Sequence, residues 1–157
     1  MKLRLALVIV LISSICTTGA LACGDSLYHV GKGVAYRVYT APLPGSVLVY
    51  GQTDGAKKLA EALAQSGHGV RLVDNQIDLS MELQSGNYDV IIAPYNEHDT
   101  VESSTGGAGE TTDFLPVAMS QDEEKAAEQA YSKVMLAERD EIKHYLKAIH
   151  KSLKSKT

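Results

Sequence analysis

Short apolar runs alternate with helical patterns along the chain from Ser46 onward. The run Ser46–Tyr50 is β-branched and apolar, which predicts a buried strand. Apolar residues then recur every three or four positions, which predicts a helix capped by Thr53 or Asp54 and ended by glycines. The apolar face of this helix comprises Ala56, Leu59, Ala60, Leu63 and Ala64, and the glycines are Gly67 and Gly69.

The same alternation continues to the end of the chain. Further strands are predicted at residues 70–73, 89–93, 114–119 and 133–136, with Pro116 interrupting the fourth strand. Helices are predicted at residues 76–84, at 122–131 behind Ser120, and from about residue 140 onward. Residues 96–113 are acidic and rich in Ser and Gly, a composition that makes a poor helix and predicts a loop.

Strands that alternate with helices over this length predict a parallel sheet covered on both faces. Right-handed crossovers leave few arrangements, and five strands fit the flavodoxin-like order 2-1-3-4-5 in a three-layer α/β/α sandwich. We expect this domain to occupy residues 46–157, preceded by a lead-in at residues 23–45 with a short edge strand at 33–39.

The first 22 residues have the pattern of a secretory signal. A short basic start is followed by an apolar run and then by small residues, which predicts export to the periplasm or the outer face of a membrane. Cys16 would leave with the signal, so Cys23 would be the only cysteine of the mature chain. An exported lone thiol has few good explanations.

Two explanations for Cys23 are open. Residues 19–23 (Gly-Ala-Leu-Ala-Cys) resemble the bacterial lipobox, which implies a diacylglycerol on the Cys23 sulfur and cleavage just before it. Ala20 departs from the usual leucine of that motif. Ala20 and Ala22 also fit an ordinary A-x-A cleavage rule, which would leave a free thiol able to bind metal or haem. We favour the lipid anchor.

The C-terminal part of the chain resembles the second half of a bacterial response-regulator receiver domain. The segments that carry this resemblance are residues 115–120, the acidic helix after them, residues 130–136 and the amphipathic helix at the end. Residues 87–92 resemble the third strand of a receiver. The opening Cys23-Gly24-Asp25, with glycines at 31 and 33, also looks like a group of exported bacterial proteins that carry such a domain. The resemblance implies a phosphorylated aspartate at the end of the third strand.

Most of the phosphorylation apparatus that this resemblance implies is missing. The acceptor position is Pro94, which has no carboxylate. Gly51 and Gln52 stand where acidic residues would hold Mg²⁺, and Ala137 or Glu138 stands where a lysine is expected. Ser120 alone matches the signalling Ser/Thr. We therefore expect a pseudo-receiver without phosphotransfer, acting as a non-enzymatic module that binds a protein partner or ligand at the cell envelope.

Ligands of open α/β sheets bind at the carboxyl ends of the strands, so we predict a binding surface there. Its candidate residues are Gln52, Thr53, Asp54, Pro94, Tyr95, Asn96 and Ser120. Residues 50–56 also resemble the phosphate loop of flavodoxins, which makes FMN an alternative ligand, although a capped strand-to-helix turn is favoured. Glu97, His98 and Asp99 are weak metal candidates, and a solvated loop is favoured because they match no known ligand spacing.

Charge limits the partners. The chain has a net charge of −4, and loss of the signal would remove two of 15 basic residues and no acidic ones, giving −6. Nucleic-acid binding would need a basic field and is not expected. Residues 139–156 carry six basic and two acidic residues, which could contact anionic lipid headgroups but more simply form a solvated face.

A periplasmic cofactor-binding or redox protein remains the alternative function, and an enzyme ranks last.

Overall fold

The computed structural model describes residues 40–85, 87–105 and 112–156. The predicted signal, Cys23 and the predicted edge strand at 33–39 lie outside these residues. Five parallel strands form one sheet in the order β2-β1-β3-β4-β5, which confirms the predicted flavodoxin-like order. The strands are β1 (Ser46–Tyr50), β2 (Gly69–Val73), β3 (Val90–Pro94), β4 (Asp113–Ala118) and β5 (Met135–Leu136).

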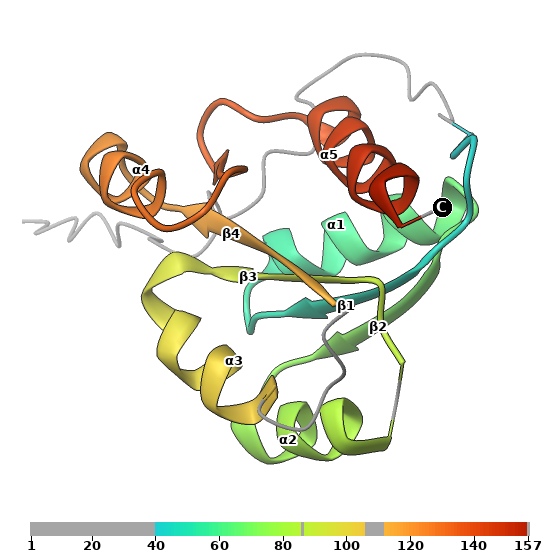
Figure 1. Cartoon of the computed structure of the whole chain (residues 1–157). Helices are drawn as coiled ribbons and strands as arrows, with labels where there is room; N and C mark the ends of the chain where they lie inside the picture. Colours follow the sequence, from blue (N-terminus) through green and yellow to red (C-terminus); the bar gives the residue numbers. More distant parts are fainter. Residues whose placement is uncertain (1–39, 86, 106–111, 157) are drawn as a thin grey trace, which may run out of the picture.

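Helices cover both faces of the sheet and complete the three-layer α/β/α sandwich (Figure 1). The helical segments are α1 (Asp54–Gln65), α2 (Gln76–Ser85), the 3₁₀ turn η1 (Tyr95–Glu97), α3 (His98–Thr105), α4 (Gln121–Ala127) and α5 (Ile142–Ser155). Helices α1 and α5 lie on one face, and α2 and α3 on the other (Figure 1). No helix in the described ranges is both long and apolar enough to span a membrane.

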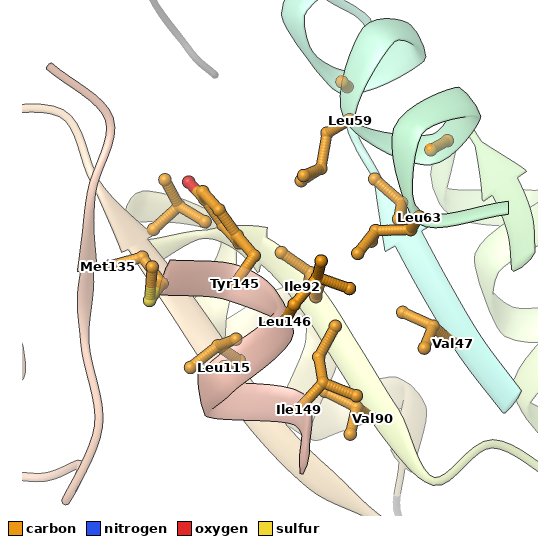
Figure 2. Packing of buried hydrophobic residues seen from close by; sticks show 14 of the residues in the cluster. Val47, Leu59, Leu63, Val90, Ile92, Leu115, Met135, Tyr145, Leu146 and Ile149 are labelled. Carbon is orange, nitrogen blue, oxygen red and sulfur yellow. The ribbon is translucent and has the colours of Figure 1, made fainter. Parts of the chain in front are cut away.

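The larger core lies between the sheet and the pair α1 and α5, as Figure 2 shows. Alternate strand residues point to this face because side chains in a strand change sides with every residue. Val47 from β1 and Ile92 from β3 meet Leu59 of α1 and Ile149 of α5 there, and all four are fully buried. The apolar residues that recur every three or four positions in α5 therefore form the side of the helix that packs on the sheet.

The second core lies on the opposite face. Leu48 and Ile91 point to this side and pack against Leu79 of α2 and Val101 of α3. Val101 is only 1% exposed. The prediction of a loop over residues 96–113 is therefore wrong for residues 98–105, which form α3. The burial of Val101 stabilises a helix that the local propensities of its neighbours disfavour.

The last strand is shorter than the predicted range 133–136. In β4, the N–H of Asp113 donates to the carbonyl of Asp89 beside β3, while the carbonyl of Ala118 accepts from the N–H of Ala137. The backbone N–H and C=O groups of successive residues in a strand point alternately to the two neighbouring strands. The even-numbered residues of β4, including Pro116, therefore direct these groups toward β5. Pro116 has no N–H to donate to the carbonyl of Lys133, and the β5 ladder accordingly begins only at Met135.

Candidate functional site

A pocket of about 300 Å³ opens where the carboxyl ends of β1, β3 and β4 meet. Four of the predicted surface residues line it, namely Gln52, Thr53, Pro94 and Asn96. The remaining wall comes from Tyr50, Gly51, Glu97 and Met119. The predicted residues Asp54, Tyr95 and Ser120 are sequence neighbours of this wall but do not line the pocket. The sheet thus brings together loops that lie more than forty residues apart in the chain.

The loop after β1 is a capped helix start. Thr53 is the N-cap of α1, and its hydroxyl oxygen accepts the N–H of Ala56 at 3.2 Å. The N–H of Lys57 donates to the carbonyl of Thr53 at 3.2 Å, and the Lys57 ammonium lies 3.5 Å from Asp54. The one hydroxyl that a flavodoxin-like loop would offer to a phosphate is therefore engaged in the cap, and the exposed carboxylate of Asp54 stands at the same helix end.

The end of β3 combines a buried proline with an aromatic stack. Pro94 is buried at the position where a receiver would carry its acceptor carboxylate. The next residue, Tyr95, stacks on the ring of His98 with centroids 4.9 Å apart and planes 8° apart. The ring of Tyr131 meets Tyr95 edge-on at 6.3 Å. This stack holds Tyr95 away from the pocket and places an aromatic cluster beside it.

Glu97 supplies the negative charge of the pocket. It lies in the lining together with Tyr50, whose side chain is 8% exposed. Burial raises the pKa of the Tyr50 phenol, and the carboxylates of Glu97 and Asp74 raise it further. The phenol therefore stays protonated at neutral pH. The pocket lining also carries the side-chain amides of Gln52 and Asn96, and Glu97 is its one carboxylate.

Ser120 serves the start of α4. Its hydroxyl oxygen accepts the N–H of Glu123 at 3.2 Å, which makes Ser120 the N-cap, as predicted. The Glu123 carboxylate in turn accepts the N–H of Met119 at 2.7 Å. These reciprocal bonds resemble a capping box and fix Met119, whose side chain reaches the pocket. Ser120 acts on this site through the turn that it stabilises.

The three weak metal candidates lie at the junction of η1 and α3. His98 is engaged on both ring nitrogens: Nδ1 lies 2.8 Å from the carbonyl oxygen of Tyr95, and Nε2 lies 3.3 Å from a carboxylate oxygen of Asp99. Glu97 instead faces the pocket. In the described part of the chain, no group of three or more His, Cys, Asp or Glu side chains is placed to hold a metal ion. Cys23 is not among the described residues.

Two features of the site region have no signal in the patterns that predicted the rest. Tyr50 and Met119 line the pocket, although the sequence marks them only as strand residues. The fold places Asp140, which the sequence presents as one more charge before the last helix, in a buried network at the end of β5.

The described residues form a flavodoxin-like α/β fold with a small pocket at the carboxyl end of its sheet. Comparison of the chain with family models, with curated proteins and with solved structures finds no match.

Proposed function

We propose that this chain is an exported pseudo-receiver, anchored by a lipid on Cys23, that binds a partner protein through the carboxyl end of its sheet. It is not an enzyme and is not phosphorylated. The observation that carries the proposal is the composition of the pocket in which a receiver would perform its chemistry. That pocket holds the buried Pro94 and the neutral pair Gly51 and Gln52.

The neighbouring positions support the same conclusion. Phosphoryl transfer needs an acceptor carboxylate, a divalent cation held by further carboxylates, and a cation that stabilises the phosphoryl oxygens. Ala137, which follows β5 where a receiver lysine is expected, is fully buried and has no charge to supply. A pocket at this end of the sheet without the groups that phosphoryl transfer needs favours recognition over catalysis.

A photo-crosslinking experiment in intact cells tests the binding surface. A photoreactive amino acid at Gln52, which is exposed in the pocket wall, should yield one discrete crosslinked protein of constant mass. The same group at Glu61, an exposed position on α1 outside the pocket, is the matched control and should yield none. Equal crosslinking from both positions, or none from Gln52, would contradict a specific surface at this end of the sheet.

Incubation with acetyl phosphate and Mg²⁺ tests the absence of phosphotransfer. We expect the intact mass to remain unchanged, because Pro94 offers no oxygen to phosphorylate. Stoichiometric addition of one phosphoryl group would refute the pseudo-receiver. The mass of the protein extracted from native membranes tests the anchor separately, since a chain that starts at Cys23 should carry acyl groups, and Cys23→Ser should release it from the membrane.

A further inference from the structure

A second hollow, of about 480 Å³, runs along the edge of β4 where β5 is missing. One wall is Asp113, Phe114 and Leu115 of β4, and the other is the segment 130–133. Lys151, Ser152 and Ser155 of α5 close the top. We call this hollow the β4 groove. It shares no lining residue with the pocket at the carboxyl end of the sheet.

Among the described residues, none pairs its backbone with the outer edge of β4 at Phe114. The alternation along β4 directs the N–H and the carbonyl of Phe114 into the groove, because Asp113 bonds toward β3 and Ala118 toward β5. Pro116 prevents the chain before Met135 from continuing the ladder. Within the described part of the chain, no backbone hydrogen bond joins Phe114 to residues 130–134. Phe114 therefore offers one donor and one acceptor in the spacing that an added strand uses.

Positive charge gathers around this open backbone. Lys133 lines the groove, and its ammonium donates to the hydroxyl of Ser152 at 2.8 Å. Burial lowers the pKa of Lys133, Asp113 opposes this, and the nearby charges of Lys151 and Lys156 lower it further. Asp113 is the one acidic residue in the groove wall, against Lys133 and Lys151.

The exposed side of α5 extends this charge. Lys147, Lys151 and Lys154 follow one another on its solvent side, and none of them makes an ion pair with another described residue. A hollow of about 370 Å³ shares Ser132, Lys133 and Lys151 with the β4 groove. Its lining adds the basic residues Arg139 and Lys147 and the acidic residues Glu128 and Asp140. No acidic side chain in the described part of the chain therefore neutralises these lysines.

We propose that the β4 groove binds an extended acidic segment of a partner protein, which adds as a short strand beside Phe114 and pairs its carboxylates with Lys133 and Lys151. A polypeptide is the occupant because a peptide group supplies both the acceptor and the donor that the Phe114 backbone requires. The segment is acidic because the lysines of the groove outnumber its single carboxylate. This surface is additional to the one in the proposed function.

The test uses the full chain expressed with its own N-terminus and three fluorescent hexapeptides of alternating sequence. The first alternates Glu and Val, the second alternates Lys and Val, and the third is the Glu-Val peptide with alternate backbone nitrogens methylated. Fluorescence anisotropy should detect binding of the first peptide only, and this binding should weaken as salt increases. Hydrogen exchange of the Phe114 amide should slow when that peptide is bound.

Two charge reversals on α5 provide the matched pair of variants. Lys151→Glu should weaken binding by about tenfold or more, because Lys151 lines the groove. Lys154→Glu, also exposed but outside the groove lining, should weaken it less than about threefold. Both side chains are exposed, so both variants should keep the circular dichroism melting curve of the parent protein.

Several results would overturn the proposal. Equal binding of the Lys-Val peptide would refute the charge preference, and equal binding of the methylated peptide would refute strand addition. Loss of affinity in Lys154→Glu as large as in Lys151→Glu would place the interaction on the helix instead of the groove. Binding of vesicles containing phosphatidylglycerol that Lys151→Glu abolishes, without binding of the acidic peptide, would assign the lysines to a membrane surface. None of these results bears on crosslinking at Gln52.

Discussion

The buried carboxylate of Asp140 should be among the most costly polar side chains to remove from this protein. It lies between β5 and α5 and is 6% exposed. One of its oxygens accepts the N–H of Leu136 at 2.8 Å and that of the Arg139 guanidinium at 3.0 Å. Arg139 also reaches Glu124 of α4 at 2.8 Å, and His144 lies 3.2 Å from the other Asp140 oxygen. Asp140 thereby ties three elements together at the end of the sheet.

The cost of Asp140→Ala follows from these contacts. The substitution leaves the buried N–H of Leu136 without an acceptor, which costs about 1–3 kcal/mol. Arg139 has 55% of its side chain exposed, so solvent screens its pair with Asp140, which adds up to about 1 kcal/mol. We expect a total loss of about 2–4 kcal/mol, and roughly half of it for Asp140→Asn, whose amide oxygen can still accept from Leu136.

Urea unfolding followed by circular dichroism at neutral pH measures this loss. The midpoint should fall in Asp140→Ala with the slope unchanged, while Glu138→Ala, an exposed neighbour, should change stability by less than about 0.5 kcal/mol. A loss below about 0.5 kcal/mol in Asp140→Ala would refute the reasoning. It would show that water or a local shift satisfies the N–H of Leu136.

The acid dependence provides a second check on Asp140. Burial by itself would raise the pKa of this carboxyl, but the hydrogen bonds from Arg139 and Leu136 outweigh it and lower the pKa overall. A lowered carboxyl pKa stabilises the fold above the ordinary value of 3.8, and this stabilisation is lost as the pH falls through the folded value. The difference between the parent protein and Asp140→Asn should therefore shrink in acid. A constant difference would contradict a charged Asp140 in the folded state.

Three further predictions concern the fold. Burial lowers the pKa of His68 below its ordinary 6.5, so the unfolding free energy should decrease as the pH is lowered through 6.5, and His68→Asn should remove that decrease; a His68→Asn profile identical to that of the parent protein would contradict a neutral buried imidazole. Val101→Ala should destabilise by about 1–3 kcal/mol in urea, against less than about 0.5 kcal/mol for the exposed Ser103→Ala, and equal effects would refute α3 packing. Pro116→Val should lengthen β5 through a new bond to the Lys133 carbonyl, seen as slow exchange of the residue 116 amide; fast exchange would refute proline as the cause.

Periodicity predicted the sheet because its signal is local. The hydrophobic pattern indicates which side chains must be buried, as in the apolar run at residues 89–93 and in the apolar side of the last helix at Ile142, Leu146 and Ile149. The preference for right-handed crossovers then leaves few possible strand orders, and the observed order is among them. The helix α3 has no such signal, since Val101 is its single buried residue. Its stability comes from the core beneath it, which a local pattern does not contain.

The sequence predicted which loops form the candidate site, but not which of their side chains line the pocket. Topology alone places Gln52 and Asn96 at the same end of the sheet, because parallel strands share one carboxyl edge. Which side chains turn into the pocket depends on local bonding that composition does not reveal. Asp54 lies beside Lys57 at the start of α1, and Tyr95 stacks on His98, so neither lines the pocket.

Two prolines in neighbouring strands lie at or next to the two proposed binding surfaces. Pro94 lies opposite Val117 in the ladder between β3 and β4, and Pro116 lies opposite Ala93. Pro94 closes β3 without a carboxylate and lines the pocket at the carboxyl end of the sheet. Pro116 removes one donor from the outer edge of β4, and this leaves room for another chain. A central strand disfavours proline, so both residues cost stability relative to a regular strand. Their joint presence supports the two surfaces proposed above, one at the carboxyl end of the sheet and one at its edge.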